Sequence, residues 1–265
     1  MDIGLIIIGD EILSGKRQDR HFAGVRRILA QRGLALAWVY YLPDDRCRIR
    51  ATLARTFAGD DHGSRVGPTL QGGETHIVFC IGGIGATPDD HTRQAAAEAL
   101  GLPLVLHPEA ARLITERTRE LGLPLTPERL RMGEFPSGAQ IIPNPYNRIP
   151  GFSLRAHHFL PGFPEMAWPM LEWVLDVHYA GRLHGEPRVE ASMIVRGLAE
   201  ATLTPLMEAV ERDHPGVRVF SLPRLDPQRR TGYEIELGVK GPPDAVEPAM
   251  RRLREGALAL GGELV

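Results

Sequence analysis

Residues 77–92 read IVFCIGGIGATPDDHT, and this stretch restricts the possible folds of the chain more than any other. The apolar run Ile77–Ile81 predicts a buried strand that leads directly into a turn with three glycines within four residues, Gly82–Gly85. The Ala-rich segment Arg93–Leu100 then predicts a helix. A strand, a glycine turn and a helix in this order are how α/β proteins present backbone N–H groups to an anion.

Two adjacent carboxylates, Asp89 and Asp90, lie between the glycines and the predicted helix. Paired carboxylates at an anion site suggest a second charge, either a metal ion or a proton that must be moved. An alternative is a tight turn in which Asp89 or Asp90 caps the helix, since Thr87-Pro88-Asp89-Asp90 has the composition of an N-cap. That alternative uses only one aspartate and does not require the glycines.

Up to about Val177, apolar runs typical of buried strands alternate with segments of helical periodicity. This alternation predicts a mainly parallel sheet with helices on both faces. Asp10 follows the first predicted strand, Asp44 the second, and the segment 82–90 the third. Because ligands of such sheets bind beyond the carboxyl ends of the strands, we expect these residues to share one edge of the sheet.

The pattern changes after a boundary that we place in Tyr179–Pro187. Beyond it, strands with alternating polar and apolar residues predict a small α+β domain in the order β-α-β-β-α. We therefore expect an α/β domain over residues 1–180 and the small domain over residues 186–265. The polar, glycine-rich segment 59–74 predicts a loop.

Composition excludes several classes of partner. The 265 residues carry a net charge of −2, which gives no indication of binding to nucleic acid or to an anionic membrane. The apolar runs are too short to span a bilayer. The N-terminus leads directly into a strand and does not show the pattern of a signal peptide. The two cysteines are too few and too far apart in sequence to suggest a disulfide framework, so we expect a cytoplasmic protein.

Two further segments carry residues that could contribute to a binding or catalytic site. Gly9-Asp10-Glu11 places a carboxylate pair after a strand, where capping or a salt bridge is the simpler explanation. Residues 161–166 (PGFPEM) form a turn into a helix and could shape a pocket wall. The chain has neither a G-x-S-x-G elbow nor a G-x-x-x-x-G-K-[ST] loop. The adjacent His157 and His158 lie in a predicted strand, so their rings should face opposite sides.

Five motifs occur in an order and spacing that resemble the competence/damage-inducible protein A (CinA) family. They are GDEILSG, the PDD segment, GGIGATPDDHT, FPSGAQIIPNP with PGF, and LPGFPEM. The resemblance covers nearly the whole chain and implies the form without the C-terminal amidase domain found in many CinA proteins. It also implies a molybdopterin-binding fold like that of molybdenum cofactor biosynthesis proteins (MoaB and MogA), a three-layer α/β/α sandwich.

The resemblance further implies a metal-dependent nucleotide pyrophosphatase that cleaves ADP-ribose or a similar dinucleotide into AMP and a sugar phosphate. The expected cofactor is Mg²⁺, Mn²⁺ or Co²⁺, in keeping with oxygen ligands. Two alternatives stay open: a molybdopterin-binding protein of cofactor biosynthesis, and a non-catalytic binding protein. The expected partners are a small nucleotide or pterin phosphate and a second copy of the chain in a homodimer.

Carried onto this sequence, the resemblance assigns three sets of site residues. Those expected to act in catalysis are Asp44, Asp89 and Asp90. Those expected to bind substrate are Gly9, Gly82, Gly83, Gly85, Thr87, Thr92, Pro161 and Gly162. Those expected to hold a metal ion are Asp10, Glu11, Asp89 and Asp90.

Overall fold

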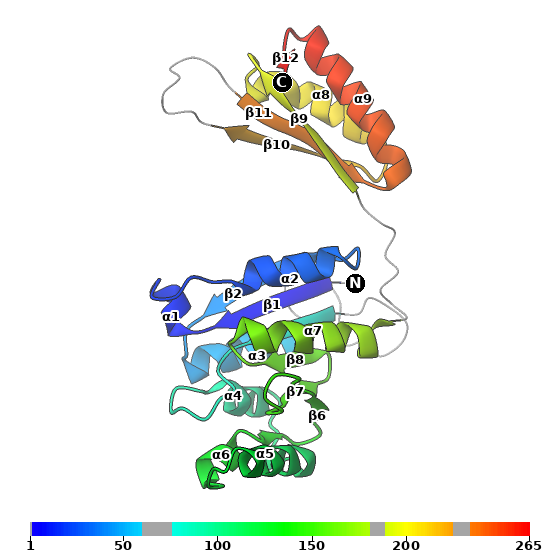
Figure 1. Ribbon diagram of the computed structural model, residues 1–265. Coiled ribbons are helices and arrows are strands. Elements are labelled where there is room, and N and C mark those ends of the chain that lie inside the picture. Colours follow the sequence, from blue (N-terminus) through cyan, green and yellow to red (C-terminus); the bar gives the residue numbers. More distant parts are fainter. Residues whose placement is uncertain (1, 60–75, 181–188, 225–233) are drawn as a thin grey trace. The chain divides into compact units, whose positions relative to one another are not determined.

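The computed structural model describes residues 2–59, 76–180, 189–224 and 234–265. The chain forms two compact units, Met1–Leu183 and His184–Val265, which run from blue to yellow-green and from yellow to red in Figure 1. The predicted loop over residues 59–74 lies outside the described residues, apart from Gly59.

The first unit is built on a six-stranded sheet. In the order in which they lie side by side, its strands are β2 (Leu36–Leu42), β1 (Asp2–Ile8), β3 (His76–Ile81), β8 (His157–Leu160), β7 (Gly151–Leu154) and β6 (Gln140–Ile142). The pairs β1–β2, β1–β3 and β3–β8 are parallel, whereas β7 is antiparallel to both of its neighbours. The predicted mainly parallel α/β class is therefore confirmed.

Helices cover both faces of this sheet, as Figure 1 shows. One face packs against α2 (His21–Ala30) and α7 (Pro164–His178), and the other against α3 (Arg46–Ala58) and α4 (Thr92–Ala99). Because successive strand residues point to opposite faces, Leu5 and Ile7 join the first core while Ile6 and Ile8 join the second. Because both faces of the sheet are buried against helices, the central strands are continuous hydrophobic runs.

The remaining elements of the first unit are short or peripheral. They are α1 (Asp10–Leu13), β4 (Leu104–Leu106), α5 (Pro108–Glu120), α6 (Pro127–Arg131) and β5 (Glu134–Pro136). Strands β4 and β5 form a separate two-stranded sheet. Phe135 of β5 stacks on Phe152 of β7 with ring centroids 4.7 Å apart, which joins this peripheral part to the core of the unit.

The two adjacent histidines at the start of β8 face opposite sides of the sheet, as predicted. Nε2 of His157 lies 2.9 Å from Oγ1 of Thr56 on α3, whereas His158 lies between Ser153 of β7 and Tyr179 after α7. All of these side chains are buried. The histidines therefore join the helical layers to the sheet.

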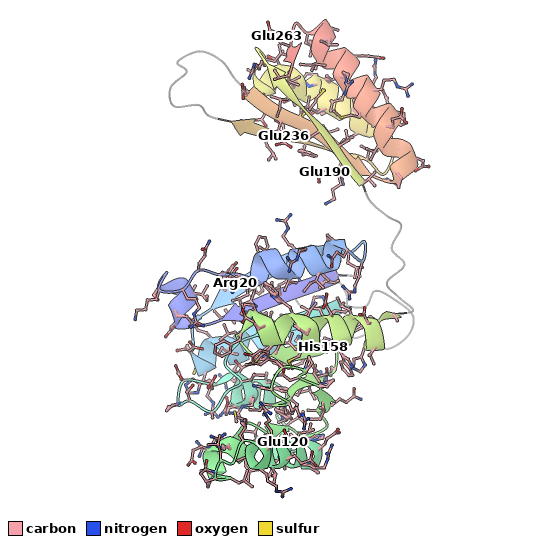
Figure 2. The ribbon with its side chains drawn as sticks, in the orientation of Figure 1. Arg20, Glu120, His158, Glu190, Glu236 and Glu263 are labelled. Atoms are coloured by element: carbon pink, nitrogen blue, oxygen red, sulfur yellow. The ribbon has the colours of Figure 1, made fainter. Side chains whose placement is uncertain are left out.

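The second unit consists of β9 (Val189–Arg196), α8 (Glu200–Asp213), β10 (Arg218–Arg224), β11 (Glu234–Gly241), α9 (Pro243–Ala259) and β12 (Glu263–Leu264). Its antiparallel sheet has the order β10-β11-β9-β12, and both helices pack on one face around a common core. The order β-α-β-β-α is extended by the short strand β12, which gives a ferredoxin-like arrangement. Glu190 and Glu236, labelled in Figure 2, come from neighbouring strands of this sheet.

Among the described residues, no helix is both long enough and apolar enough to cross a membrane.

Candidate functional site

Four neighbouring strands of the first unit end at the same edge of the sheet, which we call the carboxyl edge. Strands β2, β1, β3 and β8 run parallel and finish at Leu42, Ile8, Ile81 and Leu160. Backbone hydrogen bonds continue past the strand ends, from the Gly9 amide to the Leu42 carbonyl and from the Gly82 amide to the Leu160 carbonyl, each at 3.0 Å. The predicted site residues, which follow these strands directly, are thereby brought to one edge.

The glycine turn (Gly82–Ala86) has a backbone that only glycine fits at its first positions. Gly82 has a φ of +112°, and a Cβ there would lie 2.1 Å from the carbonyl oxygen of Ile8. Gly83 has a φ of +68°, and a Cβ there would lie 2.3 Å from Oγ1 of Thr92. Larger residues are excluded both by conformation and by close approach.

Thr92, the first residue of α4, holds the glycine turn from the helix side. Its buried hydroxyl donates to the Gly82 carbonyl at 3.0 Å, and its amide donates to the Gly83 carbonyl at 2.9 Å. The structure thus gives Thr92 contacts with the turn's backbone.

Asp90 closes the loop between the turn and α4 and does not cap the helix. Its Oδ2 accepts from the Thr87 amide at 2.8 Å and from the Thr87 hydroxyl. The N-cap of α4 is His91, without a side-chain hydrogen bond, so the N-cap interpretation of Thr87–Asp90 was wrong. A Cβ on Gly85 would lie 2.6 Å from Oδ2 of Asp90, so a larger residue there would displace this carboxylate. A carboxylate oxygen of aspartate can accept a hydrogen bond from a backbone amide either at a helix N-cap or, as with Asp90, within a loop.

Asp10 and Asp44, which follow neighbouring strands, bind each other's backbone. The Asp10 amide donates to Oδ2 of Asp44 at 2.8 Å, and the Asp44 amide donates to Oδ1 of Asp10 at 3.3 Å. Asp45, one residue later, caps α3 by accepting from the Arg48 amide at 2.8 Å. Asp45, not Asp44, therefore caps α3, and Asp44 stays at the carboxyl edge.

Four carboxylates at this edge are close enough to influence one another, and we call them the acidic cluster (Asp10, Glu11, Asp44 and Asp89). Burial raises the pKa of Asp44, the bond from the Asp10 amide opposes that rise, and the charges of Asp10, Glu11 and Asp89 add to it. At exposed Asp89, a hydrogen bond with Thr87 lowers the pKa. The cluster therefore combines a carboxyl group that resists ionisation with one that ionises readily.

A pocket of about 310 Å³ opens beside the acidic cluster, on the face of the sheet covered by α2 and α7. The ends of β1 and β3 contribute apolar side chains to its lining, and the starts of α1, α2 and α7 contribute polar ones. Glu11 belongs to both the pocket and the cluster. Gly162 lines the pocket and lies against the glycine turn, since a Cβ on it would be 3.6 Å from Cα of Gly82. Turn and pocket are thus contiguous.

Polar residues at the starts of α2 and α7 frame this pocket. The buried His21 ring lies with Nε2 3.1 Å from the Gly162 carbonyl, and burial lowers the pKa of His21. Arg20, labelled in Figure 2, pairs with Glu165 at 3.3 Å. The Arg17 guanidinium lies 5.8 Å from the Phe163 ring centroid. These contacts order the pocket wall that the motif over residues 161–166 suggested.

Two residues at the site were not singled out by the sequence reasoning. His21 lies two positions after Asp19 and is held by the Asp19 carboxylate through its amide at 2.7 Å. Arg93 is almost fully buried, with 1% of its surface exposed, and donates to the Gly85 carbonyl at 2.7 Å. An arginine in a helical segment is usually solvated, so only its tertiary partners reveal this role.

The part of the chain that the structure describes contains no group of three or more His, Cys, Asp or Glu side chains arranged to hold a metal ion. The oxygen donors of the acidic cluster suit Mg²⁺ or Mn²⁺, which often take one or two protein carboxylates and complete their coordination with substrate phosphates and water. A cation here would therefore need oxygens from the ligand.

Comparisons with known proteins agree with this architecture. The family described as "Probable molybdopterin binding domain" matches residues 4–180. A CinA-like protein from Anaeromyxobacter dehalogenans is 30% identical over 273 residues, which cover 100% of this chain but 61% of that protein. A protein from Caldivirga maquilingensis is 31% identical over 89% of this chain and 87% of its own length.

Among solved structures, the protein CinA from Thermoplasma acidophilum, whose function is unknown, shares the fold with a TM-score of 0.54 and 24% identity. The alignment covers 66% of this chain and 96% of that one. The predicted resemblance to CinA proteins is thereby confirmed. Because the matched family covers residues 4–180, more than half of the chain, the protein belongs to the family of probable molybdopterin-binding domains.

Proposed function

We propose that the carboxyl edge of the first unit binds a phosphate-bearing nucleotide or pterin. One observation carries this proposal: among the described residues, the amide N–H groups of Gly83, Ile84, Gly85 and Ala86 donate no hydrogen bond. Partly buried amides normally have partners, and a row of them at a strand-to-helix turn suits a phosphate group.

The pocket beside the turn suits the ring system of such a ligand. Its volume of about 310 Å³ lies within the range of small-molecule sites, and its lining includes the apolar residues Ile7 and Ile81. Polar groups at its wall, such as Arg20 and Glu11, offer partners to ring substituents. A phosphate on the turn and a ring in the pocket would occupy contiguous space.

Binding should be tested by calorimetry with AMP, ADP-ribose and molybdopterin. The variant Gly85→Ala pushes a methyl group toward Oδ2 of Asp90 and should weaken binding about tenfold or more. Gly122→Ala is the control for an added methyl group, because no atom lies within 4 Å of a Cβ there; unlike Gly85, Gly122 has a positive φ, of +65°. Equal affinities in the wild type and both variants, or no binding by the wild type, would overturn the proposal.

A second candidate function is hydrolysis of the pyrophosphate in ADP-ribose with Mg²⁺, Mn²⁺ or Co²⁺, giving AMP and a sugar phosphate. The acidic cluster favours it: burial raises the pKa of Asp44, three neighbouring carboxylates add to that rise, and a cation would relieve their repulsion. When bound, the cation would supply charge neutralisation at the phosphates. One or two of the carboxylates of Asp10, Glu11 and Asp89 would hold it together with phosphate oxygens of the ligand, and Asp44 would accept a proton from water.

AMP release from ADP-ribose, measured with and without each cation, tests this second function. Asp44→Asn keeps the shape of the side chain but removes its basicity, so release should fall by about 10²-fold or more. Asp45→Asn, at the cap of α3, is the matched control. Binding without metal-dependent release in the wild type would leave a ligand-binding protein, the non-catalytic alternative.

The last part of the proposal concerns the cellular location and the oligomeric state of the protein. We propose that it acts in the cytoplasm as a homodimer; gel filtration with light scattering measures the oligomeric state.

A further inference from the structure

We infer that Arg93 is the positioning residue of the glycine turn and sets the direction in which the turn's amides point. The inference rests on the proposed phosphate site and concerns how that site is built. Arg93 is the second residue of α4 and has 1% of its surface exposed. A charged side chain this deep in a protein needs partners for its hydrogen atoms.

The partners of Arg93 are all backbone carbonyls, and they come from two separate segments. Nη2 donates to Gly85 at 2.7 Å, while Nη1 donates to Arg131 and, at 3.4 Å, to Glu134. Arg131 ends α6 and Glu134 begins β5, so Arg93 joins the turn to a segment about 40 residues later. The planar guanidinium can serve these separate acceptors at once, which a lysine ammonium cannot do with the same geometry.

The geometry of the peptide bond turns this contact into a constraint on the ligand site. In a trans peptide, the C=O of one residue and the N–H of the next are coplanar and point in opposite directions, and the described chain has no cis peptide. A donor that holds the Gly85 carbonyl on the α4 side therefore directs the Ala86 amide away from α4. Without that donor, the peptide unit between Gly85 and Ala86 is free to rotate.

Thr92 orients the amides of Gly83 and Ile84 in the same way. It holds the Gly82 carbonyl through its hydroxyl and the Gly83 carbonyl through its amide, which directs the amides of Gly83 and Ile84. The first two residues of α4 thus orient three amides of the turn toward a common side. Arg93 alone is responsible for the last of them.

The charge of Arg93 adds to this arrangement. Burial lowers the pKa of Arg93, and the nearby Glu134 and Asp90 carboxylates oppose that change. A guanidinium stays protonated in proteins, so the turn is backed by a fixed positive charge. Such a charge favours an anion on the turn.

The test uses inorganic pyrophosphate as the probe and the full chain with Arg93→Met and Arg93→Lys. By calorimetry, we expect Arg93→Met to bind pyrophosphate at least about tenfold more weakly than the wild type, since a charged hydrogen bond is lost. Arg93→Lys, with its charge retained, should recover part of the affinity. Phe135→Leu, a buried change in β5 beside Glu134, controls for loss of stability in the same region.

Amide NMR spectra distinguish positioning from a general structural role. In the wild type, pyrophosphate should shift the resonances of Gly83, Ile84 and Ala86. In Arg93→Met, pyrophosphate should no longer shift the amide resonance of Ala86. It should still shift the resonances of Gly83 and Ile84, because Thr92 orients those amides. Wild-type protein that does not bind pyrophosphate would refute the phosphate site itself. Binding by the wild type with an unchanged Ala86 response in Arg93→Met, or equal weakening in Phe135→Leu, would refute only the role of Arg93.

Discussion

Strand β8 has polar groups near both ends, and the His158 ring near its start differs from the backbone amides beyond its end in having hydrogen-bond partners within the protein. At its start, Nδ1 of His158 lies 2.8 Å from Oγ of Ser153, and Nε2 lies 2.8 Å from the hydroxyl of Tyr179. Beyond its end, at Gly162, lie the pocket and the glycine turn, in which the amides of Gly83, Ile84, Gly85 and Ala86 have no partner among the described residues. Polar groups satisfied within the protein hold the fold together, whereas unsatisfied ones at a pocket are available to a ligand.

We expect that protonation of the buried histidines at the start of β8 makes the protein less stable at low pH. Burial lowers the pKa of His158 to about 3 and that of His157 well below its ordinary value of 6.5. The unfolded chain therefore binds more protons than the folded one below pH 6.5, so stability falls as pH falls from 6.5 toward 3. The loss from His158 alone is on the order of 4 kcal/mol. Urea unfolding at a series of pH values measures it.

The matched variant for this prediction is His158→Phe, which cannot titrate. Its stability at pH 7 is lower, because Ser153 and Tyr179 lose a partner, but its slope with pH should be shallower than that of the wild type. An unchanged slope would show that His158 is not the group responsible. Ligand binding at the other end of the strand should be unaffected at pH 7.

At the carboxyl edge, Gly82→Ala should destabilise the protein by about 3 kcal/mol and abolish binding of AMP. The added Cβ would meet the Ile8 carbonyl oxygen at 2.1 Å, in a conformation with φ of +112°. Guanidinium unfolding and calorimetry measure the two effects. Gly138→Ala, with φ of +85° and open space around the Cβ, should show a smaller loss of stability and normal binding.

The variant Thr92→Val removes a single hydroxyl with little change in the shape of the side chain. Loss of its bond to the Gly82 carbonyl should cost about 1 kcal/mol of stability, and should weaken pyrophosphate binding several-fold by freeing one amide. Thr56→Val, which removes a buried hydroxyl near His157, should cost stability without affecting binding. Similar binding losses in both variants would argue against a local effect.

The smallest effect is expected at the ion pair between Arg20 and Glu165. Both side chains are more than half exposed, so Glu165→Gln should change stability by less than about 1 kcal/mol. Thermal unfolding of the two proteins at low and high salt measures the difference. A larger change would mean that this pair supports the pocket wall more than its exposure indicates.

The sequence predicts much of the first unit because its strands are continuous apolar runs followed by glycines or acids. Strand β7, with four residues, and helix α1, with four, are too short for periodicity to reveal. The alternative in which Asp89 or Asp90 caps the helix was wrong, because an aspartate that caps a helix and one that closes a loop occur in the same local composition. The burial of Arg93 could not be predicted, since it depends on the carbonyls of Arg131 and Glu134, which only the tertiary fold brings near.

A crystal structure of the protein with bound ADP-ribose would test the proposed phosphate site most directly. We expect phosphate oxygens within about 3 Å of the amide nitrogens of Gly83, Ile84 and Ala86, with a ring in the adjoining pocket. Phosphates bound elsewhere, with these three amides left without a ligand, would contradict it.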